Sequence, residues 1–189
     1  NYQNAYAKLD LSVTFVNTAL YTIVAVAFLA LLCGAAAWTI ARNKGRFYRF
    51  AYLYFIIGIL IPAQALFLPI YIVGYRTGLV NTRVGVILMF IATNLSFGVF
   101  LMTSFMSTVP VELEEAADIA GASFWKRMAS IIVPLAKNGF ISGFMLTFIS
   151  IAKELDLIII MMTPTTRTMS YLAFTYSQDG YNQMADAIS

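Results

Sequence analysis

The sequence predicts an all-α protein with several membrane-spanning helices, and three observations carry this prediction. Of the 189 residues, 60% are hydrophobic and 11% are charged, whereas soluble domains carry about 25% charged residues. Three stretches contain no charged residue: 11–41, 50–75 and 84–111. Each is longer than the roughly 20 residues that a helix needs to cross the hydrocarbon core, and none shows the polar face of a soluble amphipathic helix. We therefore predict a single polytopic transmembrane domain over residues 1–189, with four to five membrane segments.

The first two predicted spans are separated by the densest basic cluster in the chain. The first span covers 11–41. The second covers 50–74 and contains Pro62 and Pro69, so we expect it to be a kinked helix. Four basic residues within eight positions lie between the spans, which is typical of a cytoplasmic loop: Arg42, Lys44, Arg46 and Arg49.

The third and fourth predicted spans enclose a polar segment. After an external turn at 75–83, the third span covers 84–107. The polar segment occupies 108–130 and the fourth span covers 131–162. Residues 163–189 are too polar for a span, and we expect them to form an external amphipathic segment.

The basic residues also set the orientation. If the loop at 42–49 and the polar segment lie inside, seven basic residues are cytoplasmic and four are external, in agreement with the positive-inside bias. Both chain ends then lie outside. Because the chain lacks an initial Met and ends in a polar stretch, we expect a fragment of a longer protein. The two sets are Arg42, Lys44, Arg46, Arg49, Lys126, Arg127 and Lys137 inside, and Lys8, Arg76, Arg83 and Arg167 outside.

The polar segment begins with signals for the start of a helix. Pro110 suits the first helical turn, where its missing N–H costs nothing. The carboxylates of Glu112, Glu114 and Glu115 follow, and the helix dipole favours negative charge in these turns. The segment 108–130 is therefore predicted to open with a short helix.

The same segment contains a stop signal and a second start. Ala116 and Ala120 lie four residues apart and form a smooth stripe that a partner can approach closely. Gly121 suits the left-handed position that ends a helix, and Ser123 suits the N-cap of a second, amphipathic helix. From these residues alone, a partner-binding helix pair and an ordinary helical loop are equally good interpretations.

The spacing of these residues resembles the EAA motif of bacterial binding-protein-dependent ABC transporter permeases. That motif reads Glu-Ala-Ala, three residues, Gly, nine residues, Ile, one residue, Leu-Pro. The match consists of Glu115-Ala116-Ala117, Gly121, Ile131 and Pro134, with Val133 in place of Leu. The resemblance implies that 108–130 is a coupling loop that docks into a cytoplasmic ATPase. It implies coupling roles for Glu112, Glu115, Ala116, Ala117, Asp118, Ala120, Gly121 and Pro134.

Other stretches bear on the transported substrate. Residues 62–69, 78–82 and 109–117 resemble the carbohydrate-uptake, maltose-type branch of these permeases. Residues 148–167 are more similar to ferric-iron-type permeases of the same superfamily. The resemblance implies a small solute, with a sugar preferred and ferric iron or another solute as the alternative.

The resemblance further implies a type I ABC importer permease of the bacterial cytoplasmic membrane, working by alternating access. The implied partners are a cytoplasmic ATP-binding subunit, a second permease subunit, an extracytoplasmic solute-binding protein and membrane lipid. ATP and Mg²⁺ would be bound by the ATPase, and no cofactor by this chain. An ATPase-independent membrane channel or scaffold is the alternative from another class.

Ionisable residues at membrane depth are functional candidates because burying them in lipid is costly. Lys153 and Asp156 lie three residues apart on one predicted helix face, where they can neutralise each other, and Glu154 points elsewhere. We consider two interpretations for these residues: the lining of the translocation path, and charges that reach the outer membrane interface. Asn94 is a further path candidate, although hydrogen bonding between helices explains it better.

Several absences narrow the function. The chain has no Gly-x-x-x-x-Gly-Lys-Ser/Thr run, so it is not itself expected to be the ATPase. It has no His and a single Cys, Cys33, which argues against a disulfide framework, a zinc site or a His-dependent catalytic triad. The basic residues flank apolar segments, so topology explains them better than a nucleic-acid partner. We expect neither a catalytic residue nor a metal site.

Overall fold

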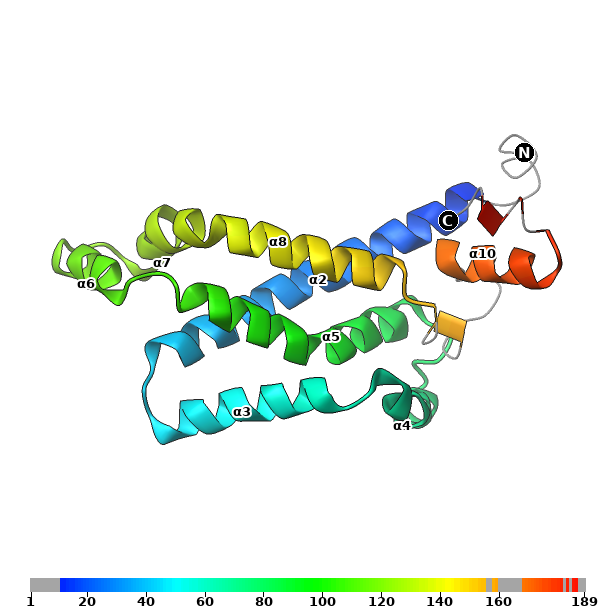
Figure 1. Cartoon of the computed structure of the whole chain (residues 1–189), viewed down its shortest axis with the longest axis horizontal. Coiled ribbons are helices and arrows are strands. Elements are labelled where there is room, and N and C mark those ends of the chain that lie inside the picture. The colour runs from blue at the N-terminus through cyan, green and yellow to red at the C-terminus, as the bar shows by residue number, and fades with distance from the viewer. Residues whose placement is uncertain (1–10, 156–157, 160–167, 182, 184, 187–189) are drawn as a thin grey trace. The chain divides into compact units, whose positions relative to one another are not determined.

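The fold is seen in a computed structural model that describes residues 11–155, 158–159, 168–181, 183 and 185–186. All regular structure in these residues is helical (Figure 1), which confirms the predicted class. The elements are α2 (Leu11–Arg42), α3 (Arg46–Leu60), α4 (Ala63–Arg76), α5 (Arg83–Met106), α6 (Val111–Ile119), α7 (Phe124–Arg127), the π-helical turn η1 (Met128–Ile132), α8 (Val133–Ala152) and α10 (Met169–Gln178).

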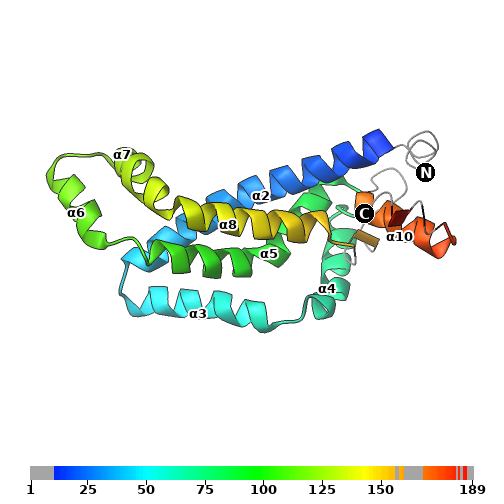
Figure 2. The ribbon, with the colours of Figure 1, turned by 45° about the horizontal axis from the view of Figure 1, so that its top comes forward.

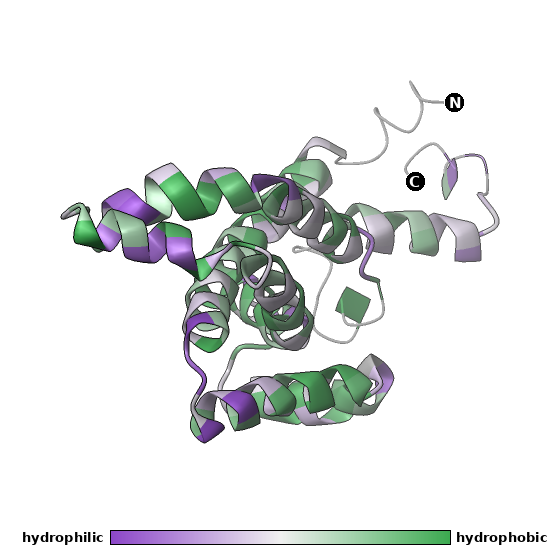
Figure 3. Ribbon diagram, turned by 60° about the vertical axis from the view of Figure 1, so that its left-hand side comes forward, coloured by the Kyte–Doolittle hydropathy of each residue, from purple (hydrophilic) through white to green (hydrophobic). Residues whose placement is uncertain are grey.

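Three helical segments in the described part of the chain are long and apolar enough to cross a membrane: Ser12–Arg42, Arg83–Met106 and Phe124–Ala152. Counting α3 and α4 together as one interrupted span gives a fourth. Coloured by hydropathy, the long helices are mostly hydrophobic, and hydrophilic residues gather at helix ends and connections (Figure 3). The predicted polytopic helical class is therefore confirmed, with three to four candidate spans in the described residues where four to five were predicted.

The second predicted span differs from the prediction. The structure breaks it into two helices instead of bending one. Helix α3 ends at Leu60, Ile61 is extended with φ −79° and ψ 119°, and α4 begins after Pro62. The ring of a proline disfavours the helical conformation of the residue before it, so the helix ends at this point. Pro69 lies inside α4 without interrupting it.

The fourth predicted span also needs correction. Helix α7 has four residues and continues through η1 into α8, so it is not a separate amphipathic helix. The Val133 N–H donates to the Met128 carbonyl, a wider turn than that of an α-helix. Such a turn accommodates Pro134, which has no N–H of its own to donate. The helix then ends at Ala152, ten residues before the predicted boundary.

The chain divides into two compact units, and α2, α5 and α8 contribute residues to both. The first unit contains Asn1–Ala27, Pro62–Thr93 and Phe148–Ser189, and the second contains Phe28–Ile61 and Asn94–Thr147.

In the first unit, α10 is attached to α2 and to the end of α8. The Met169 N–H donates to the Thr18 hydroxyl at 2.9 Å, and the Ser170 hydroxyl donates to the Ala152 carbonyl at 2.9 Å. Leu172, a residue of α10, is buried. With ten residues, α10 is too short to span a membrane, and its external location stays a prediction. Residues 163–167 of that predicted segment lie outside the described part.

In the second unit, the helices approach closely where glycine leaves room. A Cβ at Gly98 of α5 would lie 2.6 Å from the Cys33 sulfur of α2. A Cβ at Gly139 of α8 would overlap the Phe105 ring of α5. Figures 1 and 2 show α5 lying between α8 and α3. Small residues of this kind allow close packing of helices in lipid.

This packing predicts different effects for two glycine-to-alanine changes. In Gly139→Ala the new methyl group would displace the Phe105 ring, so we expect the free energy of unfolding to fall by about 1–3 kcal/mol. In Gly34→Ala nothing lies within 4 Å of the new methyl, and alanine is the better helix former by roughly 0.5–1 kcal/mol. Thermal unfolding of the full-length protein in detergent measures both, and Phe105→Leu should partly rescue the first. Equal losses from the two changes would contradict this packing.

Candidate functional site

The polar segment, residues 108–130, folds locally much as its sequence predicts. Helix α6 begins directly after Pro110. At its C-terminus, the Gly121 N–H donates to the Asp118 carbonyl and the Ala122 N–H to the Ala117 carbonyl, both at 2.9 Å. This pair of bonds is a Schellman motif, and it places Gly121 in the left-handed region with φ +77°. The predicted stop signal is confirmed.

The second helix start is only partly as predicted. Ser123 occupies the N-cap position of α7 with φ −62° and ψ 159°, but its side chain makes no capping hydrogen bond. Helix α7 is held instead by an aromatic contact. The rings of Phe124 and Trp38 meet edge to face, with centroids 5.1 Å apart and planes at 78°.

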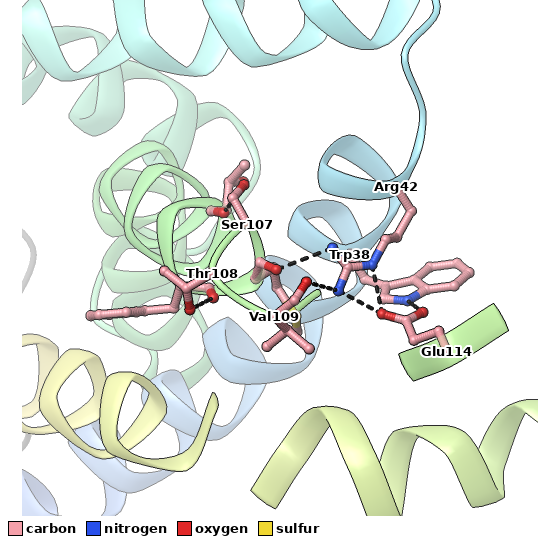
Figure 4. A network of polar contacts seen from close by, with 9 residues as sticks. Trp38, Arg42, Ser107, Thr108, Val109 and Glu114 are labelled. Carbon is pink, nitrogen blue, oxygen red and sulfur yellow. Dashed lines mark hydrogen bonds and ion pairs between the residues drawn. The ribbon is translucent and has the colours of Figure 1, made fainter. Parts of the chain in front are cut away.

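A buried ion pair fastens α6 to the end of α2. Glu114 is 8% exposed and accepts from Arg42 Nε at 2.6 Å through Oε1. A second nitrogen of the Arg42 guanidinium, Nη2, lies 2.5 Å from the same Glu114 oxygen. Trp38 Nε1 donates to the other carboxylate oxygen at 3.4 Å. Figure 4 shows the indole and the guanidinium converging on this carboxylate. The contact joins residues 72 positions apart.

The same guanidinium also binds two backbone carbonyls at and just after the C-terminus of α5. Arg42 Nη1 donates to the Met106 carbonyl at 3.1 Å, and Nη2 donates to the Val109 carbonyl at 3.2 Å (Figure 4). The last carbonyls of a helix have no partner within the helix, and the dipole makes this end attractive to a cation. Arg42 therefore connects α2, α5 and α6 through one side chain.

A second ion pair links α6 with α7. Arg127 Nη1 lies 2.7 Å from Asp118 Oδ1. The Asp118 side chain is 64% exposed, so water screens this pair and it contributes little to stability. The Arg42–Glu114 pair is the principal electrostatic anchor of the polar segment.

The opposite face of α6 is open. Ile119 is 90% exposed and Trp125 of α7 is 78% exposed. Exposed apolar side chains that lie beside carboxylates are typical of a binding surface. Most predicted coupling residues lie on this helix or its C-terminal turn: Glu112, Glu115, Ala116, Asp118, Ala120 and Gly121 are exposed, and Ala117 is half-buried. Pro134 lies apart from them, in the first turn of α8.

The predicted path residues are placed differently. Asn94 is half-buried within α5. Lys153 is in a turn after α8 has ended, and Glu154 follows without regular structure, so the predicted helix face shared by Lys153 and Asp156 does not form at Lys153. Asp156 itself lies outside the described residues. Lys153 borders a cavity of about 730 Å³ in the first unit, together with Thr18, Phe148, Ser170 and Phe174.

The sequence alone does not identify the anchor. Arg42 stands out only as one of four clustered basic residues, and Glu114 only as one of three carboxylates at a helix start. The sequence contains one signal for the α2 side of this contact. Trp38 and Arg42 lie four residues apart and therefore on one face of α2. Their partner on α6 is a tertiary contact that spacing does not reveal.

The sequence that forms this site matches a family of membrane proteins. Residues 27–187 match the family model described as the binding-protein-dependent transport system inner membrane component. The chain belongs to this family. The family comprises inner membrane proteins, in agreement with the predicted location.

Two curated relatives of this permease-family chain are named for carbohydrate transport. The diacetylchitobiose uptake system permease protein of Streptomyces coelicolor is 27% identical over 181 residues, which cover 94% of this chain and 60% of the relative. The probable starch degradation products transport system permease protein of Thermoanaerobacterium thermosulfurigenes is 32% identical over 135 residues, covering 71% of this chain and 49% of the relative. The chain thus spans about half to three fifths of the length of these relatives.

A solved structure has the same fold. It is the crystal structure of a bacterial ABC transporter involved in the import of the acidic polysaccharide alginate. The TM-score is 0.81 at 18% sequence identity, with 99% of this chain and 70% of that chain covered. The predicted ABC importer permease fold is confirmed.

Proposed function

We propose that this chain is the membrane-spanning part of an ATP-driven ABC importer that takes up a carbohydrate delivered by an extracytoplasmic binding protein. Family membership and the relatives named for sugar transport support this proposal. One structural observation carries it: α6 is held by a buried carboxylate on one side and exposes its other side. A partner that binds the exposed side of α6 and displaces it would also displace the helices to which α6 is attached.

The proposed coupling works as follows. A cytoplasmic ATPase subunit, which binds the ATP and Mg²⁺, grips α6 at Ile119 and the neighbouring carboxylates. When two such subunits close, α6 shifts, and the guanidinium of Arg42 carries the shift into α2 and α5. Together with a second permease subunit, these helices open the passage alternately to either side. Glu112 and Glu115 supply negative charge on the exposed face for the partner to recognise.

The relatives and the cavity beside Lys153 support the proposed substrate class. Its lining combines the aromatic rings of Phe148 and Phe174 with the hydroxyls of Thr18 and Ser170. A mostly apolar wall with a few placed polar groups is typical of a small-molecule site, and it suits a sugar. Ferric iron is less well supported, because the described residues contain no group of three or more His, Cys, Asp or Glu side chains that could hold a metal ion.

The test is reconstitution of the full-length protein with its ATPase subunit and binding protein in vesicles. We expect uptake of a labelled di- or oligosaccharide that requires internal ATP, and no uptake of ferric iron. Uptake that proceeds without the ATPase would favour the channel alternative. Uptake of iron without any sugar would overturn the substrate class.

A further inference from the structure

The polar segment meets α8 through the π-helical turn η1 (Met128–Ile132). Helix α7, η1 and α8 together form one helical segment, Phe124–Ala152. Within the part of the chain that the structure describes, no other stretch is π-helical. Such turns are rare and often occur at functional sites. Pro134, the predicted coupling residue that lies beyond α6 and its C-terminal turn, comes two residues after η1.

Pro134 disfavours an ordinary α-helix at this junction. In an α-helix the N–H of position 134 would donate to the Ser130 carbonyl, but proline has no N–H and its ring presses against that carbonyl. The Val133 N–H bonds instead to the Met128 carbonyl, five residues back. Pro69, however, lies inside α4 without interrupting it. A second influence must therefore select the wider turn beside Pro134.

That influence is the packing of side chains at every fourth position. Ile132 and Ala136 are buried, at 1% and 4% exposed, and Phe124 and Met128 before them are half-buried. One face of the segment thus continues inward from α7, across η1, into α8. The residue that follows each of these four is exposed: Trp125, Ala129, Val133 and Lys137.

A regular α-helix would not keep these four side chains on one face. At 3.6 residues per turn, each step of four residues rotates about 40° past a full turn, so Phe124 and Ala136 would point about 120° apart. A π-helical turn takes up about one additional residue, equivalent to about 100° of rotation, and so removes most of this difference. The turn η1 therefore sets the rotation of α7 about its axis relative to α8, which we call the register of α7.

This register decides what α7 contacts. It places Phe124 against Trp38 of α2, with ring centroids 5.1 Å apart, and leaves Trp125 on the open side, 78% exposed. It also brings Arg127 to Asp118 of α6. A rotation of α7 by one residue position, about 100°, would take Phe124 away from Trp38.

We propose that Pro134 is a positioning residue for coupling. By favouring the open turn η1, it fixes the register of α7 and hence the side of the polar segment that faces a partner. Pro134 acts through the main chain and needs no contact with the ATPase. The consequence for transport rests on the proposed function, whereas the register can be measured without it.

Cysteine crosslinking in the full-length transporter measures the register directly. In a Cys33→Ala background, a short bis-maleimide should join Trp38→Cys to Phe124→Cys. Pro134→Ala allows the turn to close into an α-helix, so we expect the crosslinking yield to fall about threefold or more. Without the cysteine changes, Pro134→Ala should lower sugar uptake to a similar extent. Pro69→Ala is the matched control, because it removes a proline from a helix that has no π turn, and it should change either measurement by less than about twofold.

Deletion of Ser130 in the Pro134→Ala background separates a change of register from general damage. Removing one residue from an unbroken α-helix turns α7 back by about 100°, so crosslinking should return. The proposal is overturned if Pro134→Ala crosslinks as well as the unchanged protein, if Pro69→Ala loses as much, or if the deletion restores nothing. A transporter that follows the expected crosslinking pattern but takes up no sugar would support the register role and contradict the proposed function.

Discussion

Replacing Arg42 with methionine is expected to release α6 from the helices behind it. The change removes the cationic partner of the buried Glu114 carboxylate, which keeps only the bond from Trp38. It also removes the bonds from the guanidinium to the Met106 and Val109 carbonyls, and Met106 then accepts only from the Val109 N–H. Removing one member of a buried pair costs about 3–5 kcal/mol. We expect a loss of that order in the free energy of unfolding, and ATP-dependent uptake should be abolished in the assembled transporter.

The control for this experiment lies in the same segment. Arg127→Gln breaks the exposed pair with Asp118, which should cost no more than about 1 kcal/mol and leave α6 attached to α2. Glu114→Gln should fall between the two, because its amide oxygen still accepts from Arg42. Similar losses in Arg42→Met and Arg127→Gln, measured by thermal unfolding of the purified complex, would show that the buried pair is not the anchor.

Replacing Gly121 with valine is expected to separate ATP hydrolysis from transport. Gly121 has φ +77°, and a Cβ built on it meets nothing within 4 Å, so the penalty comes from the backbone alone. For an L-residue it amounts to about 1–2 kcal/mol, and a β-branched side chain is the least tolerant of this conformation. The turn between α6 and α7 should change shape, so that ATP is hydrolysed without uptake.

Gly78 provides a matched control for that change. It has φ +69° in the turn before α5, again with nothing within 4 Å of a built Cβ. Gly78→Val should therefore strain the backbone to a similar degree, while hydrolysis and uptake remain coupled. The coupling role of Gly121 would be wrong if Gly121→Val kept full uptake, or if both variants lost coupling to the same extent.

The sequence predicts those features that single residues determine locally. The ends of α2 and α5 lie within one residue of the predicted span limits, since charged or polar residues mark both. Gly121 ends α6 as predicted, because no other residue type adopts that conformation so readily. The EAA spacing also indicates where the exposed helix lies, since Glu115 is inside α6 and Gly121 follows just beyond its C-terminus.

The differences arise where tertiary packing or a local steric effect decides. Pro62 ends a helix that hydropathy alone would continue, and α8 ends before Lys153 although apolar residues follow. The Arg42–Glu114 pair joins positions 72 residues apart, and no local pattern connects them. Among the four basic residues of that cluster, only packing distinguishes Arg42, which is almost buried, from its exposed neighbours.

The central claim, that α6 faces the cytoplasm and is covered by an ATPase, is tested most directly by a cysteine at position 119. Ile119 is 90% exposed, and the single native cysteine, Cys33, is buried, so a membrane-impermeant maleimide should label Ile119→Cys selectively. We predict labelling in inside-out vesicles but not in right-side-out vesicles, and protection when the ATPase subunit is bound. Labelling from the external side, or unchanged labelling in the assembled complex, would contradict this account.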